Sequence, residues 1–169
     1  EVAELELGAP LKAEEFDMVF IGGAQDREQR RVADDLAAHK GEPLREAVER
    51  GAALLAVCGG YQLMGRFYRT AEGEELPGVG VFDLWTAHPG PRARRFIGNV
   101  VVEWRGKTLV GFENHGGRTY LGAGVEPLGR VVAGGDMAGL SLAGRLGRAA
   151  RVGAGQSSAG PKTQPPVLR

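Results

Sequence analysis

The sequence predicts an α/β fold in which a parallel core sheet is joined by antiparallel strands in the second half of the chain. Two short apolar runs, Phe16 to Gly23 and Ala52 to Val57, are separated by a stretch with helical periodicity. The second half instead contains β-branched runs divided by turn residues. Strands that alternate with helices build parallel sheets, whereas strands joined by tight turns pair antiparallel.

The first helix is expected to begin at Asp26 and to end near Gly41. Asp26 is a favourable N-cap residue, and Gln29 follows three positions later, as in a capping box. Four apolar residues then recur at helical spacing: Val32, Ala33, Leu36 and Ala37. Gly41 can close the helix, because glycine readily adopts the left-handed conformation found at helix C-termini. One face of this helix is therefore expected to be buried.

A second helix and a second strand are expected to follow directly. Pro43 suits the first turn of a helix that runs to about Arg50 and that Gly51 ends. The run from Ala52 to Val57 is then the second parallel strand. The short first run, with its terminal glycines, suits a buried parallel strand that leads into a loop.

Four runs in the second half are expected to be strands. They are Gly78 to Trp85, Arg94 to Trp104, Lys107 to Asn114 and Leu128 to Gly134. Arg105, Gly106 and Lys107 supply a hairpin turn between the second and third of these runs. The polar, glycine-rich stretch from Asn114 to Gly122 is expected to be a loop that carries His115.

Length and composition are typical of one soluble globular domain. The chain has 169 residues with 21 basic and 21 acidic side chains, so no net positive field favours a nucleic-acid partner. One cysteine cannot form an internal disulfide, and no apolar run is long enough to span a membrane, so we expect a cytoplasmic protein. Since the chain begins with Glu1 rather than methionine, we expect an N-terminal piece with the first strand to be missing.

Cys58 is the strongest candidate for a catalytic residue. It stands between an apolar strand and a glycine-started helix, with the small residues Ala56 and Gly60 two positions to either side. A strand that turns sharply into a helix holds the turn residue in strained geometry with its side chain exposed, as a nucleophile requires. The alternative is a buried cysteine packed as a small hydrophobe. Gly59 and Gly60 argue against it, since a core position gains nothing from two flexible residues.

The loops that follow the two parallel strands are expected to face one pocket, because ligands of open α/β sheets bind at the carboxyl ends of the strands. Gly22 and Gly23 end the first strand, and Cys58 and Gly59 follow the second. Backbone N–H groups near Gly23 and at Gly59 could then form an oxyanion hole for the tetrahedral intermediate of an acyl transfer. The alternative for Gly22 and Gly23 is an ordinary turn.

Four segments together resemble the glutaminase subunit of bacterial lipid II isoglutaminyl synthase, in the cobyric-acid-synthase-like branch of class I glutamine amidotransferases. In chain order the segments are FIGGAQDREQ, LLAVCGGYQLMG, RRFIG and GFENHGGRTYLG, and the similarity runs from Phe16 to Ala133. The CGGYQ segment alone is typical of the wider superfamily, whereas GGAQDREQ and GFENHGGRT are typical of this branch. The resemblance implies a flavodoxin-like class I glutamine amidotransferase fold.

The resemblance also implies a reaction and a partner. Cys58 would attack the side-chain amide of glutamine, giving a γ-glutamyl thioester and ammonia, and water would then release glutamate. In the family the ammonia passes to a Mur-ligase-like subunit, which uses ATP to amidate the α-carboxyl of D-glutamate in lipid II during peptidoglycan synthesis. The chain itself is expected to need no cofactor, with ATP bound only by the partner of a heterodimer.

Carried over by position, the resemblance makes Gly23 and Gly59 oxyanion-hole residues, Arg95 a substrate-binding arginine and Gln62 a residue that lines the glutamine pocket. A guanidinium can bind a carboxylate through two hydrogen bonds, as recognition of the glutamine α-carboxylate requires. From the residues alone, Arg95 is better explained as one of the solvated charges in a basic cluster, Arg92, Arg94 and Arg95.

The general base is missing at its expected place. The family's base lies in a histidine-glycine-proline segment near the C-terminus, whereas the chain after Val132 contains no histidine. Residues 1–134 are expected to form the glutaminase domain, and residues 135–169, rich in Gly, Ala, Ser, Pro and Arg, a low-complexity, disordered tail. The tail is either a divergent native end or the product of a reading frame shifted near Gly134, and we favour the second.

The three histidines are weak substitutes for that base. His39 is expected to stabilise a helix end, His88 to lie in a loop and His115 to hold a family motif position distinct from that of the base. None shows paired ligand spacing, so no metal site is expected. Three acids stay open as the group that would orient a base: Glu103, Glu113 and Asp136. Two further functions also stay open, namely a catalytically silent scaffold subunit and another cysteine hydrolase of similar fold.

Overall fold

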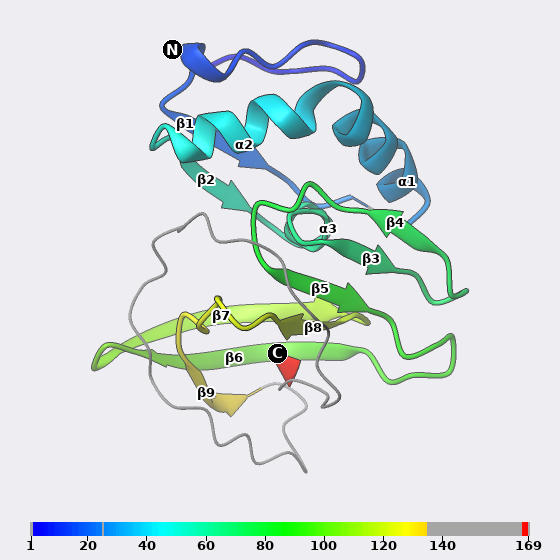
Figure 1. Cartoon of the computed structure of the whole chain (residues 1–169). Coiled ribbons are helices and arrows are strands. Elements are labelled where there is room, and N and C mark those ends of the chain that lie inside the picture. Colours follow the sequence, from blue (N-terminus) through cyan, green and yellow to red (C-terminus); the bar gives the residue numbers. More distant parts are fainter. Residues whose placement is uncertain (1, 25, 135–166, 169) are drawn as a thin grey trace.

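The parallel part of the fold is a pair of strands that end at the same edge. The computed structural model describes residues 2–24, 26–134 and 167–168. In it, β1 (Met18–Ile21) and β2 (Ala53–Ala56) pair in parallel, with Met18 opposite Ala53 and Ile21 opposite Ala56. Helix α2 lies above both strands in Figure 1. The predicted order of strand, helix and strand is confirmed.

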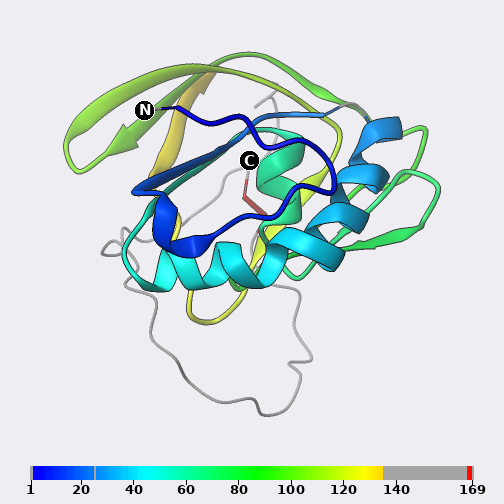
Figure 2. The same cartoon turned by 90° about the horizontal axis from the view of Figure 1, so that it is seen from above.

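One bent helical rod connects these strands (Figure 2). It consists of α1 (Asp26–Asp35), a π-helical turn η2 (Leu36–Lys40) and α2 (Gly41–Glu49). The prediction that Gly41 closes the first helix is wrong, because Gly41 has helical angles, φ −64° and ψ −48°, and its N–H donates to the Leu36 carbonyl. A Cβ at Gly41 would lie 2.7 Å from that carbonyl oxygen, so the π-turn needs glycine for close approach. Gly51, at φ +103°, follows the end of α2 as predicted.

A buried ion pair at the π-turn ties the N-terminal segment to the rod. The Lys40 ammonium donates to the Asp35 carboxylate and, at 2.9 Å, to the Glu6 carbonyl. Asp35 also accepts a hydrogen bond from the Gly8 N–H at 2.7 Å. Burial by itself raises the pKa of Asp35, but the hydrogen bonds from Lys40 and Gly8 outweigh that effect and hold the pKa below its ordinary value.

The hydrophobic core lies between the rod, the inner faces of the strands and α3 (Gly59–Leu63). Its buried members are Leu11, Ala33, Leu36, Leu44, Leu63, Met64, Tyr68, Leu76 and Val79. The parallel strands contribute alternate residues to it: Val19, Ile21, Leu54 and Ala56. Their other face is exposed, with Met18 at 55% and Phe20 at 63%. The expectation that Phe16 to Gly23 forms a buried parallel strand therefore holds for one face of β1 and is wrong for the other, which is exposed within the described chain.

A second sheet has the strand order β10-β8-β5-β3-β4 and is antiparallel except where β3 pairs with β5. Its strands are β3 (Phe67–Arg69), β4 (Glu75–Pro77), β5 (Leu84–Ala87), β8 (Arg118–Leu121) and β10 (Val167–Leu168). The strand predicted at Gly78 to Trp85 is wrong over residues 78–83, which are irregular. Backbone N–H groups of Val79 and Phe82 donate there to the carbonyls of Leu63 and Met64, at the end of α3, instead of to a neighbouring strand.

The third sheet has the order β7-β6-β9 and lies at the opposite end of the molecule from the helical rod (Figure 1). Its strands are β6 (Phe96–Trp104), β7 (Lys107–His115) and β9 (Arg130–Gly134), and all pairs are antiparallel. Arg105 and Gly106 have φ +49° and +73° and form the hairpin turn predicted between β6 and β7.

The loop predicted at Asn114 to Gly122 is wrong. Strand β7 continues to His115 and β8 begins at Arg118, so only residues 116–117 form the connection. Strand β8 pairs with β5 over its whole length, from Arg118 opposite Ala87 to Leu121 opposite Leu84. The pairing of β8 with β5 is a contact between segments far apart in the sequence. The glycine-rich local sequence therefore does not reveal it.

The predictions for residues 135–166 and 169, namely a disordered tail and a shifted reading frame, lie outside the residues that the structure describes. Across the described ranges, no helix has the length and apolar character needed to cross a membrane.

Candidate active site

Cys58 occupies the turn from β2 into α3, as the sequence predicts. Its backbone has φ +55° and ψ −120°, a conformation that costs a residue with a Cβ about 1–3 kcal/mol. The side chain is exposed, so the alternative of a cysteine packed in the core is wrong. The turn is held on both sides, because the Val57 N–H donates to the Ile21 carbonyl at 2.9 Å and the Gln62 N–H donates to the Cys58 carbonyl at 3.2 Å.

Gly60 allows α3 to pack directly against the end of β1. A Cβ at this position would lie 2.6 Å from the Gly22 carbonyl oxygen and 2.8 Å from the Ile21 carbonyl oxygen. Both atoms belong to the backbone, so no side-chain rotation could relieve the contact. The small residue two positions after Cys58 is therefore required by close backbone packing.

The loop after β1 faces Cys58, as the strand order predicts. A Cβ at Gly23 would lie 2.9 Å from Cys58 Cβ and 3.4 Å from Cys58 Sγ. At Gly22, by contrast, the nearest atom to a built Cβ is a Phe20 ring carbon at 3.8 Å. Gly23 is thus the residue whose missing side chain leaves space beside the thiol, which an ordinary turn would not require.

Gly59 brings Gln29 to the site, a residue that sequence reasoning did not assign to it. A Cβ at Gly59 would lie 2.7 Å from Gln29 Nε2 and 3.1 Å from the backbone N and O of Ala24. Gln29 belongs to α1 and is 1% exposed. In the sequence it served only as a helix-start signal. One feature of the sequence could have indicated a further role for Gln29: its polar side chain lies on the helix face that is expected to be buried.

Gln62 joins α3 to α1 and to the turn after β7. Gln29 Nε2 donates to Gln62 Oε1 at 2.7 Å, and the built Cβ position of Gly117 lies 3.0 Å from Gln62 Nε2. These contacts bring the GGAQDREQ, CGGYQ and ENHGGRT segments together, although they are far apart in the sequence.

Hydroxyl groups fix α3 to the second sheet. Tyr61 forms a side-chain hydrogen bond with Thr119. The Thr119 hydroxyl in turn lies 2.8 Å from the Thr86 hydroxyl in a buried pair. Burial raises the pKa of the Tyr61 phenol, and the hydrogen bond with Thr119 opposes that rise. Tyr61 therefore stays protonated at neutral pH and anchors α3 instead of acting as a base.

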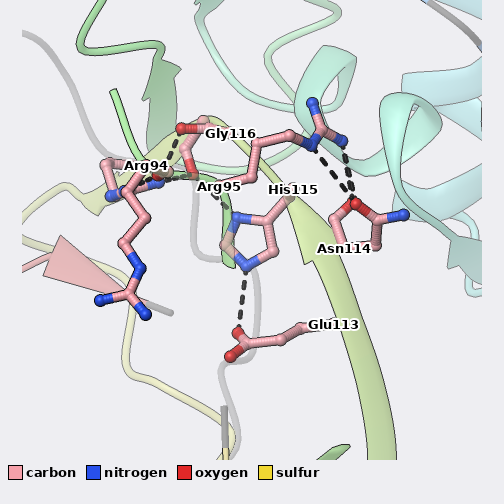
Figure 3. A network of polar contacts seen from close by, with 8 residues as sticks. Arg94, Arg95, Glu113, Asn114, His115 and Gly116 are labelled. Atoms are coloured by element: carbon pink, nitrogen blue, oxygen red, sulfur yellow. Dashed lines mark hydrogen bonds and ion pairs between the residues drawn. The ribbon is translucent and has the colours of Figure 1, made fainter. Parts of the chain in front are cut away.

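His115, at the end of β7, is held by two oxygen acceptors (Figure 3). Its Nδ1 lies 2.9 Å from the Gly117 carbonyl oxygen and its Nε2 lies 3.2 Å from Glu113 Oε2. Phe96 packs against the ring with a centroid separation of 5.4 Å. A neutral imidazole can donate to only one of the two acceptors, whereas the imidazolium can donate to both. This geometry favours a role in shaping the turn over the deprotonation of Cys58.

Arg118 reinforces the same turn and was missed by the sequence reasoning. It donates to the Gly116 carbonyl at 2.6 Å and to the Arg94 carbonyl at 2.8 Å. Its guanidinium carbon also lies 3.8 Å from the centre of the Phe96 ring. A cation stacked on an aromatic face and bonded to two carbonyls is typical of arginine.

Arg95 is held by Asn114, one residue before His115. Its guanidinium donates to Asn114 Oδ1 at 3.1 Å and to the Asn114 carbonyl at 3.4 Å. In Figure 3 the Arg95 side chain reaches Asn114 while the His115 imidazole reaches Glu113. The structure thus brings Arg95 to the ENHGGRT segment, and these hydrogen bonds do not join it to Cys58 or Gln62.

The remaining histidines have places of their own. His88 Nδ1 accepts a hydrogen bond from the Gly90 N–H at 3.1 Å, and its Nε2 lies directly against Gly116, where a Cβ would not fit. His39 lies in the last turn of η2. Among the residues placed in the structure, no group of three or more His, Cys, Asp and Glu side chains is arranged to hold a metal ion.

Comparison with known proteins identifies the relatives of the chain. The family described as the CobB/CobQ-like glutamine amidotransferase domain matches residues 2–153. The lipid II isoglutaminyl synthase (glutamine-hydrolyzing) subunit GatD of Staphylococcus aureus (strain N315) is 42% identical over 134 residues, which are 79% of this chain and 53% of that protein. GatD of Streptococcus pneumoniae (strain ATCC BAA-255 / R6) is 42% identical over 121 residues, 70% of this chain and 45% of that protein.

A solved structure supports the fold. A crystal structure described as a glutamine amidotransferase superposes with a TM-score of 0.51 at 21% identity, over 70% of this chain and 64% of that chain. The predicted fold class and the resemblance seen in the motifs are therefore confirmed. The chain spans about half the length of the curated relatives it matches, 53% and 45% for the two GatD proteins.

Proposed function

The chain belongs to the CobB/CobQ-like glutamine amidotransferase family, and on this basis we propose that it is the glutaminase subunit of a lipid II isoglutaminyl synthase. Two relatives that are 42% identical to it carry that subunit's name. The observation that carries the proposal is the exposed Cys58 on a strained strand-to-helix turn, with Gly23 directly beside it.

Cys58 Sγ attacks the side-chain carbonyl carbon of glutamine in this proposal. The C–S bond forms, the C–N bond breaks, and the thiol proton leaves with the nitrogen as ammonia. Water then cleaves the thioester, which releases glutamate and returns a proton to the sulfur. The space beside Gly23, whose built Cβ would lie 3.4 Å from Cys58 Sγ, receives the oxyanion next to the N–H groups of Gly23 and Gly59.

Arg95 and Gln62 bind the substrate in the same proposal. Gln62 lies on α3, one turn after Cys58, and its backbone N–H donates to the Cys58 carbonyl at 3.2 Å. Arg95 is exposed, and its hydrogen bonds with Asn114 orient a guanidinium that can pair with the α-carboxylate of glutamine. Each residue therefore recognises one end of the glutamine molecule.

The ammonia serves a Mur-ligase-like partner subunit, which uses ATP to amidate the α-carboxyl of D-glutamate in lipid II. The chain itself needs no cofactor for the cysteine chemistry. The reaction takes place in the cytoplasm, where glutamine and ATP are supplied. The names of the two GatD relatives, each called a subunit, support an assembly of this kind.

The test is glutamine turnover by the chain together with a Mur-ligase-like subunit. We expect glutamate to form at a rate that Cys58→Ala abolishes, while Gly22→Ala, whose built Cβ has 3.8 Å of clearance, leaves it in place. Glutamate formation that persists in Cys58→Ala would contradict the proposal.

A second candidate function is a scaffold subunit without glutaminase activity, and the histidine positions favour it. His115 is engaged at both ring nitrogens, His88 packs against Gly116, and His39 lies on the helical rod. Stable binding to the Mur-ligase-like subunit without any glutamate formation would support the scaffold. Turnover of a non-glutamine ester or amide by Cys58, with none of glutamine, would instead indicate another cysteine hydrolase.

A further inference from the structure

Gln29 combines complete burial with incomplete hydrogen bonding. The residue is 1% exposed, and its Nε2 donates to Gln62 Oε1 at 2.7 Å. Its own Oε1 is buried and has no hydrogen-bond partner among the residues that the structure describes. A buried acceptor without a donor lowers stability, and an apolar residue of the same size would avoid this cost. A role in stability alone therefore does not explain a glutamine at this position.

The hydrogen bond from Gln29 selects one of two orientations of the Gln62 amide. The terminal torsion of a glutamine side chain is broad and roughly two-fold, so its oxygen and nitrogen exchange places easily unless a partner distinguishes them. In the structure the Gln29 amide turns its NH₂ group toward Gln62, and with Gln29 in this orientation Gln62 Oε1 lies toward α1. Gln62 Nε2 is left on the opposite side, where it lies 3.0 Å from the built Cβ position of Gly117.

The same Gln29 amide also lies against the turn that carries the nucleophile. Its Nε2 would be 2.7 Å from a Cβ built on Gly59, the residue that follows Cys58. One buried side chain thus contacts both Gly59 and Gln62, two residues with assigned roles in glutamine hydrolysis.

We propose that Gln29 is a positioning residue that fixes the Gln62 amide with its NH₂ group presented for glutamine binding. This inference rests on the proposed function, because it requires glutamine to bind beside Cys58 and Gln62. Gln29 acts through Gln62 and not by contact with the reacting atoms. Its loss therefore weakens substrate binding more than it slows the chemistry of the thiol.

The test measures alkylation of Cys58 in the full chain by a chloromethyl ketone analogue of L-glutamine, followed by intact-protein mass spectrometry. The reagent binds as glutamine does and then forms a C–S bond with loss of chloride, so it requires no turnover. Its half-saturation concentration reports binding, and its limiting rate reports the thiol. Iodoacetamide, which lacks the glutamine shape, measures the reactivity of Cys58 by itself.

Gln29→Met removes the donor while it keeps the side-chain length. We expect the half-saturation concentration to rise about 3- to 10-fold, the equivalent of one net hydrogen bond, with the limiting rate and the iodoacetamide rate nearly unchanged. Gln29→Leu also removes the donor and raises the same constant. It is also the deciding variant if Gln29→Met does not fold. In a Gln62→Met background, Gln29→Met has no further effect.

Lys40→Met is the matched control, because it also removes a buried polar side chain from the helical rod, but at the ion pair with Asp35. It lowers the melting temperature and leaves the half-saturation concentration as in the wild type. An unchanged constant in folded Gln29→Met or Gln29→Leu would overturn the inference while the proposed function stands. If the wild type shows no saturation at all, the proposed function fails and the inference fails with it.

Discussion

Gly23→Ala tests whether the loop after β1 leaves room for a substrate beside Cys58. The added methyl group would lie 2.9 Å from Cys58 Cβ and 3.4 Å from Cys58 Sγ. The first distance is shorter than Cβ atoms tolerate, so the loop and the turn must separate. Gly22→Ala is the matched control, because its methyl group meets only a Phe20 ring carbon at 3.8 Å.

The size of the effect follows from the displacement. Ordinary contact begins at 3.4 Å, so the Gly23 loop and Cys58 must move apart by at least about 0.5 Å, and the methyl group still lies beside the sulfur. Overpacking of this kind costs about 1–3 kcal/mol of stability. A displacement near 1 Å at a reacting centre costs about 10²-fold in rate, so we expect glutamine turnover to fall roughly 10- to 100-fold.

The assay compares both variants for glutamate formation and for alkylation of Cys58 by iodoacetamide, with thermal unfolding as the check on folding. Gly22→Ala is expected to stay within about twofold of the wild type in both rates, as a substitution without new contacts should. If folded Gly23→Ala also stayed within about twofold, the reasoning that places Gly23 against the nucleophile would be refuted.

Three other changes test separate parts of the account. Gly60→Ala puts a methyl group 2.6 Å and 2.8 Å from backbone oxygens at the end of β1. We expect the free energy of unfolding, measured with urea, to fall by about 1–3 kcal/mol. An unchanged urea midpoint would contradict the close packing of α3. Arg95→Gln should raise the KM for glutamine about 10- to 100-fold with a smaller change in kcat, as the loss of a charged hydrogen bond does. Arg92→Gln, in the same basic cluster, should leave the KM unchanged. Equal effects of the two substitutions would indicate that Arg95 is merely a solvated charge. Asp35→Asn should lower the free energy of unfolding near neutral pH by about 1 kcal/mol, because it removes the charge of the carboxylate that accepts hydrogen bonds from Lys40 and Gly8. The pKa of Asp35 in the folded protein is below its ordinary value, so this stabilisation is complete above the unfolded pKa of about 3.9 and disappears as the pH falls through the folded pKa. The unfolding free energies of the wild type and Asp35→Asn should therefore converge in acid. Parallel pH profiles of the two proteins would contradict this.

The turn at Cys58 could be predicted because its requirements are local. A short apolar strand, a small residue on either side and a glycine-started helix leave one conformation for the cysteine, and the structure has it at φ +55°. The approach of Gly23 to Cys58 was also predictable, since parallel strands bring their following loops to the same edge.

Other features depend on tertiary contacts that local patterns do not report. A glycine after a helical run is typical of a helix end, as expected of Gly41. In the structure Gly41 instead lies within the helical rod, because a Cβ there would come too close to the Leu36 carbonyl oxygen of the π-turn. Residues 118–121 follow a polar, glycine-rich stretch, and only their pairing with β5 makes them a strand. The contact of Gln29 with Gln62 joins residues 33 positions apart, so the sequence showed each glutamine but not the pair.

The central claim is that Cys58 forms a thioester with glutamine. It is tested most directly by incubating the chain and its Mur-ligase-like partner with isotopically labelled glutamine, quenching in acid and analysing the peptides by mass spectrometry. We predict a γ-glutamyl adduct on the peptide that contains Cys58, with labelled glutamate accumulating in solution, and the loss of both in Cys58→Ala. Labelled glutamate formed by Cys58→Ala as fast as by the wild type, or an adduct on a different residue, would contradict the account.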